Sequence, residues 1–317
     1  MARTTQPELA VSNSPSGRSA VRRSTAASLL ISVRPGEWIK NTFVFAGLVF
    51  SRKLTEPSAV IASVTAFAIF CALAGAVYLI NDVSDRERDG QHPRKRLRPI
   101  ASGALSPATA LTAAAVLGIG GLIAAWMLSP AFGAVATTYL TLLGLYSGPL
   151  KHIVIIDVLT IAIGFVLRVA AGAVAVAVPV SHWLLVCTIL LAMFLGLSKR
   201  RHELTLLTDG ATGHRRILQE YSPYLLDQMI GVVTASTLMA YVFYAISDET
   251  AVRFGTSLLG LTIPFPLYGI FRYLYLVHQR EGGGSPAELL LNDRPLLACV
   301  ALWGLAVVVI IYRPFGI

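Results

Sequence analysis

The sequence predicts an all-α membrane protein, built as a bundle of nine transmembrane helices. Of its 317 residues, 55% are hydrophobic and only 14% are charged, whereas a soluble domain carries about 25% charged residues. The apolar residues form runs of about 17–25 residues with almost no charge, which is long enough for a helix to cross the ~30 Å hydrocarbon layer. The composition therefore excludes an ordinary water-soluble enzyme.

Nine apolar segments supply the expected spans. The first is the least regular, because Arg34, Pro35 and Glu37 interrupt it and hold its beginning at the membrane interface. The second runs directly into a charged stretch that begins at Asn81. The expected helices cover residues 29–50, 58–80, 105–128, 131–147, 157–178, 182–198, 226–247, 255–276 and 295–313.

The breaks between the later segments are short and polar. Leu128-Ser129-Pro130 separates the third from the fourth, and a basic triplet follows the sixth. A glycine-rich linker at 282–286 follows the eighth segment. Before the ninth, Asp293 is placed to cap the helix, with Pro295 in its first turn.

Charge distribution predicts the orientation in the membrane. Residues 1–28 are expected to form a disordered cytoplasmic tail, because they are rich in Ser, Thr, Pro and Arg and lack an apolar run. Residues 29–317 then form one domain. With the N-terminus inside, 20 of the 26 Lys and Arg residues are cytoplasmic and 4 are external, as the positive-inside rule favours. We therefore expect a multi-pass plasma-membrane protein whose long polar segments, and any active site, lie on the cytoplasmic side.

The net charge of +9 does not indicate nucleic-acid binding, because the basic residues lie in short segments between apolar spans. Anionic lipid and phosphorylated substrates are the partners that this pattern favours. Cys71, Cys187 and Cys299 all lie inside apolar runs. They form neither a disulfide framework nor a CxxC metal site.

The end of the second segment carries regularly spaced carboxylates. If the helix continues past the membrane surface, Asn81, Asp85 and Asp89 share one face, with Asp82 beside them. Like charges at this spacing repel, so a compensating cation is expected, and hard oxygen ligands suit Mg²⁺. We predict a magnesium site of Asn81, Asp85 and Asp89, with Asp82 as a ligand or close neighbour.

A cluster of cations follows the acidic motif directly. Carboxylates for a metal, followed by cations for phosphate, form a two-part site for a Mg²⁺–diphosphate substrate. The alternative is a solvated helix end whose acids pair with Arg86 and Arg88. The membrane boundary, where ionisable groups are costly and usually functional, favours the two-part site. The predicted phosphate-binding cations are Arg94, Lys95, Arg96 and Arg98.

These motifs resemble the UbiA superfamily of intramembrane prenyltransferases. The resemblance lies in the NDxxDxxxD motif at 81–89, and in residues 34–41, which resemble the RPxxWxKN stretch before the family's first helix. Residues 89–103 resemble the branch that uses phosphoribosyl diphosphate. The resemblance covers roughly residues 30–315. It implies a UbiA-like bundle, with Lys40 and Asn41 among the substrate-binding residues.

The stretch after the sixth segment departs from the prenyltransferases of that superfamily. They carry a second aspartate-rich motif there, whereas this chain reads SKRRHEL at 198–204. Cations bind a metal poorly but suit a phosphate or an anionic acceptor, and KRxxEL resembles the phosphoribosyltransferase branch. Lys199, Arg200 and Glu203 are the expected catalytic participants, together with Asp82 and Asp85. Alternatively, the triplet only marks the cytoplasmic end of the helix.

Four further polar residues are predicted to bind substrate. Tyr146 and Lys151 close the fourth segment, where an interfacial anchor and a topology charge are the alternatives. Asp157 and Arg168 lie in the fifth segment about 16 Å apart along the axis, so they cannot pair directly. Arg168 therefore either holds a partner on another helix or reaches an anionic substrate.

The resemblance implies a Mg²⁺-dependent transfer of 5-phosphoribose from 5-phosphoribosyl 1-diphosphate to a polyprenyl (decaprenyl) phosphate, in the synthesis of cell-wall arabinan precursors. The alternatives are prenyl transfer to an aromatic or glycerol-phosphate acceptor, and membrane transport. The basic residues at 199–203 count against prenyl transfer. The near absence of intramembrane charge apart from Arg168 counts against transport. Small residues such as those at 118–121 suit internal packing and a homo-oligomer equally.

Overall fold

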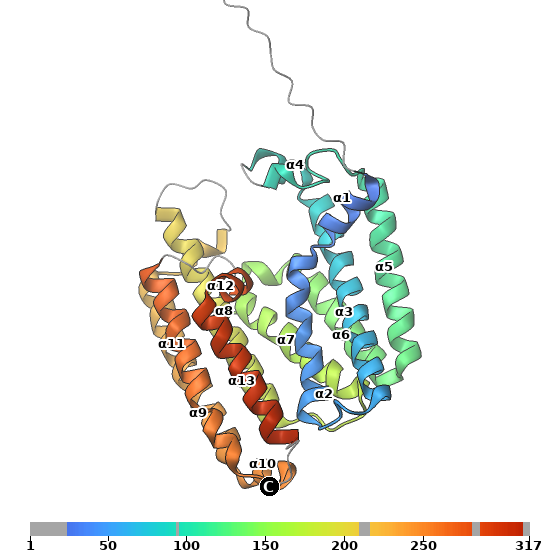
Figure 1. Cartoon of the computed structure of the whole chain (residues 1–317). Coiled ribbons are helices and arrows are strands. Elements are labelled where there is room, and N and C mark those ends of the chain that lie inside the picture. The colour runs from blue at the N-terminus through green and yellow to red at the C-terminus, as the bar shows by residue number, and fades with distance from the viewer. Residues whose placement is uncertain (1–23, 93–94, 209–215, 281–285, 313–317) are drawn as a thin grey trace, which may run out of the picture.

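The computed structural model describes residues 24–92, 95–208, 216–280 and 286–312. In this part of the chain every regular element is a helix, which confirms the all-α prediction (Figure 1). The α-helices are α1 (Thr25–Ser32), α2 (Ala46–Phe50), α3 (Pro57–Ser84), α4 (Arg86–Gln91), α5 (Pro107–Leu128), α6 (Pro130–Ser147), α7 (Ile156–Ala175), α8 (His182–Thr208), α9 (Pro223–Ile246), α10 (Asp248–Phe254), α11 (Pro264–Gln279), α12 (Pro286–Asn292) and α13 (Arg294–Tyr312). The 3₁₀ elements are η1 (Pro35–Phe45), η2 (Lys95–Leu97), η3 (Leu150–His152), η4 (Arg216–Glu220) and η5 (Leu258–Thr262).

Six of the described helices are long and apolar enough to cross a membrane: α3, α5, α7, α8, α9 and α13. A seventh is possible if α10 and the η5–α11 segment form one span, although they meet at 103°. The prediction of a helical membrane protein is confirmed at this level. The predicted count of nine spans is not confirmed.

The first expected helix, 29–50, is broken into three pieces. Arg34 has a positive φ of 54° ahead of Pro35, a conformation that a helix cannot contain. The next 11 residues form η1, an unusually long 3₁₀ run that favours a functional or strained segment. The predicted tail also differs, because Ser24 caps α1 through the N–H of Ala27 and residues 25–28 are helical. Residues 1–23 lie outside the described part.

Two further boundaries differ from prediction at the polar ends of helices. α3 ends at Ser84, and Asp85 separates it from α4, so the acidic motif does not lie on one continuous helix. In contrast, α8 continues to Thr208, and the basic stretch expected after residue 198 is helical. Arg200 and Glu203 are consequently one helical turn apart.

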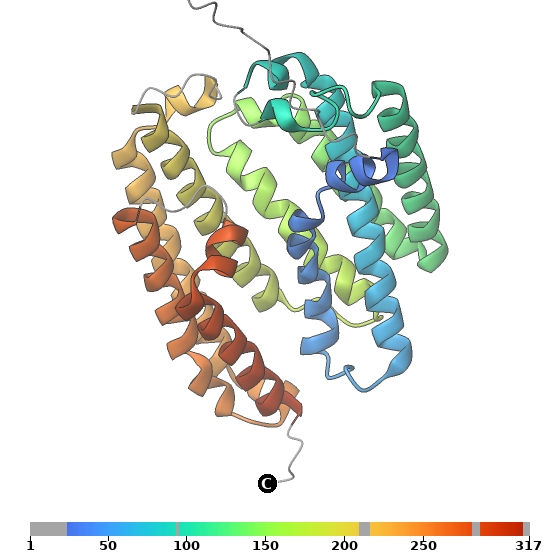
Figure 2. The ribbon, with the colours of Figure 1, turned by 45° about the horizontal axis from the view of Figure 1, so that its top comes forward.

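The helices pack as two groups with α7 between them (Figure 2). On one side, α7 contacts α6, η1 and α2, and α3 packs against α5. On the other side, α7 contacts α8, which packs against α9. Val158 near the start of α7 belongs to the core shared with α8, α9 and α11, while Ala171 near its end belongs to the core of α3 and α6. Both groups are therefore built on the same central helix.

The first segment approaches α7 backbone to backbone. A Cβ atom on Gly172 of α7 would lie 1.8 Å from the Val44 carbonyl oxygen of η1. A Cβ on Gly47 of α2 would lie 2.5 Å from the carbonyl carbon of Gly172. Small residues allow this close packing of membrane helices, and here any side chain at either position would separate the two elements.

We predict that Gly172→Ala destabilises the protein by about 3 kcal/mol or more, the upper end of overpacking costs, because the Val44 backbone cannot move independently of η1. Gly120→Ala in α5 is the matched control, since nothing lies within 4 Å of the added methyl group. The measurement is thermal unfolding of the purified protein in detergent. Equal melting temperatures for the two variants would contradict this packing.

Candidate active site

The acidic end of α3 is held by two arginines from other parts of the chain. Asp82 and Asp89 are each 3% exposed. Nη1 of Arg98, which follows η2, lies 3.1 Å from Oδ1 of Asp82 and 2.5 Å from Oδ2 of Asp89. One guanidinium nitrogen thus bridges two buried carboxylates that the break at Asp85 turns toward each other.

Arg34 is the second arginine, and the sequence analysis did not place it in the site. Its Nη2 pairs with Oδ1 of Asp82, and its guanidinium lies 4.8 Å from the ring centre of Tyr78, one turn earlier on α3. The positive φ of Arg34 turns the chain at the start of η1 toward α3. The only feature of the sequence that pointed to a functional role for Arg34 was its place in the RPxxWxKN stretch.

Asp85 differs from the other two aspartates of the motif, Asp82 and Asp89. It is half-exposed, and its only described ion pair is a 3.6 Å contact with the exposed Arg88. The alternative of a solvated, locally paired helix end therefore describes Asp85 but not Asp82 or Asp89. Asn81 is half-buried beside this group.

The oxygen donors of the motif fit a magnesium ion only in part. Among the described residues, no three acidic, His or Cys side chains converge on one point. Mg²⁺, however, commonly takes one or two protein carboxylates and fills its shell with water and substrate phosphate. The buried pair of Asp82 and Asp89 meets that lower requirement.

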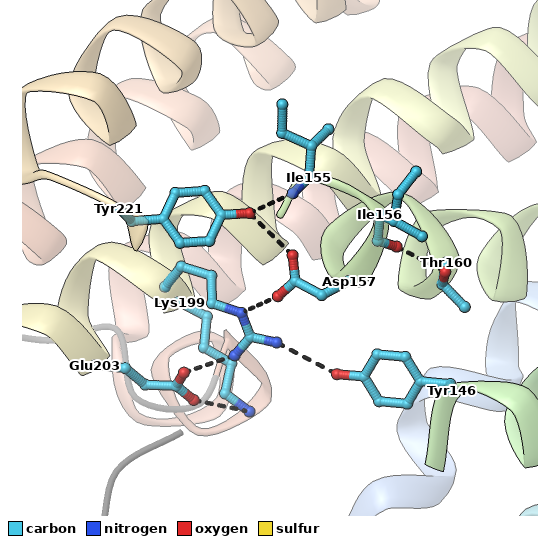
Figure 3. A network of polar contacts seen from close by, with 9 residues as sticks. Tyr146, Ile155, Ile156, Asp157, Thr160, Lys199, Glu203 and Tyr221 are labelled. Atoms are coloured by element: carbon cyan, nitrogen blue, oxygen red, sulfur yellow. Dashed lines mark hydrogen bonds and ion pairs between the residues drawn. The ribbon is translucent and has the colours of Figure 1, made fainter. Parts of the chain in front are cut away.

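The second polar cluster lies where α7 and α8 meet (Figure 3). Arg200 is 2% exposed, and its Nε donates to Asp157 at 2.7 Å. Its Nη1 donates to Glu203 at 2.6 Å, and its Nη2 donates to the Tyr146 hydroxyl at 3.3 Å. All three nitrogens of the guanidinium group are used inside the protein, so Arg200 ties α6, α7 and α8 together.

Tyr221, which sequence reasoning missed, completes this cluster. Its hydroxyl donates to Asp157 at 2.9 Å and accepts from the Ile155 N–H at 2.7 Å. Ile155 precedes α7 with a φ of 68°, a strained conformation for a β-branched residue. Burial, together with the charge of Asp157, raises the pKa of Tyr221 to about 12, so the hydroxyl keeps its proton. No sequence motif marks Tyr221, since its partners are 64 and 66 residues away.

Glu37 links the two clusters electrostatically. It lies at the start of η1, outside the six spans, and accepts from Lys40 at 2.5 Å. Desolvation alone would raise the pKa of Glu37, but Lys40, Lys199 and Arg34 together lower it below its ordinary value. Lys199 of α8 and Lys40 of η1 therefore lie within electrostatic reach of the same carboxylate. Lys199 also approaches Glu203 at 3.9 Å.

Arg168 lies away from both clusters, deep in the bundle. It donates to Oδ1 of Asn41 at 2.8 Å and to the Tyr139 hydroxyl at 2.7 Å, and its charge lies over the rings of Tyr139 and Phe165. These contacts match the expectation of a partner on another element. Asn41 is 1% exposed, so the structure uses this predicted substrate-binding residue to hold η1 to α7.

The remaining predicted residues are less constrained. Lys95 and Arg96 are exposed beside Arg98, and Lys151 is half-buried in η3. Arg94 lies outside the described residues. Arg201, the third residue of the basic triplet, pairs with Asp227 of α9. Asp293 accepts from the Leu296 N–H at 2.9 Å, which confirms its predicted capping of α13.

Comparisons with known proteins agree with this architecture. Residues 41–290 match the UbiA prenyltransferase family. The chain is 32% identical over 285 residues to a decaprenyl-phosphate phosphoribosyltransferase of Mycobacterium tuberculosis, covering 87% of this chain and 92% of that protein. The protein of the same name from Corynebacterium glutamicum is 28% identical over 295 residues, covering 92% and 88%.

The fold also resembles solved structures. A UbiA homolog from Archaeoglobus fulgidus bound to GPP and Mg²⁺ superposes with a TM-score of 0.69 at 18% identity, covering 89% of this chain and 99% of that chain. A structure described as digeranylgeranylglyceryl phosphate synthase gives a TM-score of 0.64 at 18% identity, covering 91% and 99%. At this identity the likeness concerns the fold.

We predict that Tyr221→Phe costs about 2 kcal/mol of stability, because it leaves the buried Asp157 oxygen and the Ile155 N–H without this partner. Tyr224→Phe, which removes a hydroxyl from a side chain that is 75% exposed, should change stability by less than about 0.5 kcal/mol. The measurement is the free energy of unfolding of each variant, obtained by denaturation in detergent micelles. A Tyr221→Phe variant as stable as the control would show that the network does not hold α7.

Proposed function

The chain belongs to the UbiA prenyltransferase family, and from that membership we propose that it transfers 5-phosphoribose from 5-phosphoribosyl 1-diphosphate to a polyprenyl phosphate, with release of diphosphate. Relatives at 28–32% identity that carry the name decaprenyl-phosphate phosphoribosyltransferase support the choice of substrates. A decaprenyl acceptor would make the product a precursor of cell-wall arabinan.

The observation that carries the proposal is the charge of the two clusters. Each buried carboxylate is already matched by a buried or half-buried arginine. Lys40 and Lys199 balance the carboxylates of Glu37 and Glu203, and the exposed Lys95 and Arg96 beside Arg98 add further positive charge. Positive charge in this arrangement suits the binding of two phosphorylated substrates at once. A prenyl diphosphate with a neutral aromatic acceptor presents only one phosphorylated substrate.

The carboxylates of the acidic motif fit a divalent cation as described above. Asn81, Asp82, Asp85 and Asp89 would hold it, and when bound it would neutralise negative charge on the departing diphosphate. Asp85 is suited to this role because its carboxylate is half-exposed and only weakly paired.

The reaction is a displacement at C1 of the ribose. An oxygen of the lipid phosphate forms a bond to C1 while the bond from C1 to the diphosphate oxygen breaks, and the electron pair leaves with diphosphate. Positive charge develops on the ribose ring, as in other glycosyl transfers. The acceptor phosphate is ionised at neutral pH, so no general base is required. A single displacement inverts the configuration at C1.

The protein's contribution is positioning and electrostatic stabilisation. Lys199 steers the acceptor phosphate, and Lys40, Lys95, Arg96 and Arg98 bind phosphate groups of the donor. Arg200 and Asp157, with Glu203 and Tyr146, act as positioning residues, because their contacts are made within the protein. This positioning role for Arg200 and Glu203 differs from the catalytic participation expected from sequence.

The site is proposed to face the cytoplasm, where the positive-inside rule places the charged ends of α3 and α8. A phosphoribosyl donor is soluble and arrives from that side. The polyprenyl chain remains in the bilayer, so only its phosphate has to reach the boundary. This division explains a site at the ends of the helices rather than in the middle of the bundle.

Prenyl transfer is the second candidate, because the family shares the first acidic motif. Purified protein with Mg²⁺ and polyprenyl phosphate should form a lipid product from labelled phosphoribosyl diphosphate. It should form none from labelled prenyl diphosphate with an aromatic acceptor. The opposite labelling pattern would reject the phosphoribosyl assignment.

We predict that Asp85→Asn reduces Mg²⁺-dependent turnover by about 100-fold or more, with little loss of stability because only the contact with Arg88 is removed. Glu87→Gln is the control, since it removes an exposed carboxylate two positions away. Product formation is followed by lipid extraction and mass spectrometry. Turnover of Asp85→Asn at the level of the control would exclude Asp85 from the site.

A further inference from the structure

The buried carboxylates of the acidic motif are balanced by protein charges alone. Asp82 and Asp89 carry two negative charges, and the guanidinium groups of Arg34 and Arg98 supply two positive charges in direct contact. Because Nη1 of Arg98 lies 3.1 Å from one carboxylate oxygen and 2.5 Å from the other, those oxygens are at most 5.6 Å apart. Two oxygen ligands of one Mg²⁺ are separated by about 4 Å or less. Arg98 thus lies between two carboxylate oxygens whose separation is close to the one that two ligands of a divalent ion require.

We propose that Arg98 is an exchangeable internal cation: it neutralises Asp82 and Asp89 before a metal binds, and it leaves them when the metal arrives. This inference rests on the proposed function, since it takes the acidic motif as the metal site. If a divalent ion bound while Arg34 and Arg98 both stayed in contact with Asp82 and Asp89, these four side chains and the ion would carry a net charge of +2. Such a charge in a largely buried place is costly.

The contacts of Arg98 are suited to exchange. Only Nη1 of its guanidinium has described partners, and its side chain is 30% exposed. It follows the exposed three-residue turn η2 rather than a packed helix. Arg200 shows the opposite arrangement, with three nitrogens bonded and 2% exposure. Of these two arginines, Arg98 is the one that can move at low cost.

Exchange couples metal binding to substrate binding. A guanidinium displaced from two carboxylates needs a new anionic partner, and a diphosphate group offers one at the same place. The metal alone therefore binds weakly. Donor diphosphate strengthens metal binding because it provides the displaced Arg98 guanidinium with a new anionic partner. By linkage, the metal strengthens diphosphate binding by the same factor.

The test is binding of Mn²⁺ alone, as a spin-active substitute for Mg²⁺, to the full chain in detergent, followed by electron paramagnetic resonance. Arg98→Gln should lower the Kd roughly fivefold or more, within the usual range of coupling factors. Arg86→Gln, which removes the same charge from an exposed neighbour, should change it by less than about twofold. An unchanged or higher Kd in Arg98→Gln overturns the proposal.

A second measurement needs no variant at residue 98. Phenylglyoxal modification of wild-type protein, read by mass spectrometry, should increase at Arg98 when Mn²⁺ is added and stay constant at Arg86. Reactivity at Arg98 that stays level or falls contradicts exchange.

Asp89→Asn separates the inference about Arg98 from the proposed metal site. If this variant binds Mn²⁺ as tightly as the wild type, the acidic motif is not the metal site, and the metal part of the proposed function fails together with the inference. If binding is lost but Arg98→Gln has no effect, only the inference fails.

Discussion

Among the described residues, the structure depends on matching every buried carboxylate with a guanidinium group. Asp82, Asp89 and Asp157 are nearly inaccessible, and Arg34, Arg98 and Arg200 contact them. An unpaired charge at a membrane boundary would be expensive, so these contacts determine how η1, α3, α7 and α8 are placed at their polar ends. Under the proposed function, the same charges lie next to the phosphate groups of the substrates.

The two clusters differ in how firmly their charges are held. Around Asp157, Arg200 and Tyr221 donate to different oxygens of the carboxylate, and the same tyrosine stabilises the strained Ile155. Around Asp82 and Asp89, one nitrogen of Arg98 bridges both acids, and Arg34 adds a contact to Asp82 only. The α7–α8 cluster therefore behaves as a scaffold and the α3 cluster as the adaptable part. The fold places the adaptable part at the polar end of α3, where the proposed function puts the soluble donor.

The sequence was a good guide to long apolar segments and to motifs formed by neighbouring residues. Hydropathy identified α3, α5, α7, α9 and α13 within a few residues, and it identified the start of α8 but not its end at Thr208. The apolar part of a span is easy to recognise because nearly every residue in it is apolar. It did not reveal the break at Asp85, the burial of Arg200 or the contact of Tyr221. The burial of Arg200 and the contact of Tyr221 depend on partners distant in the chain, as the separation of 43 residues between Arg200 and Asp157 shows. The count of nine spans is not confirmed, and the first predicted span is interrupted by local geometry at Arg34 and Pro35.

The long 3₁₀ run has a consequence for how the chain tolerates changes of length. With three residues per turn, each residue added or removed between Pro35 and Phe45 rotates everything that follows by about 120°. A single deletion before Asn41 would turn its amide away from Arg168 while leaving the composition of the segment almost unchanged. Insertions of three residues would restore the face but lengthen the segment by about 6 Å. The contact between Asn41 and Arg168 therefore constrains the length of this segment as well as the identity of residue 41.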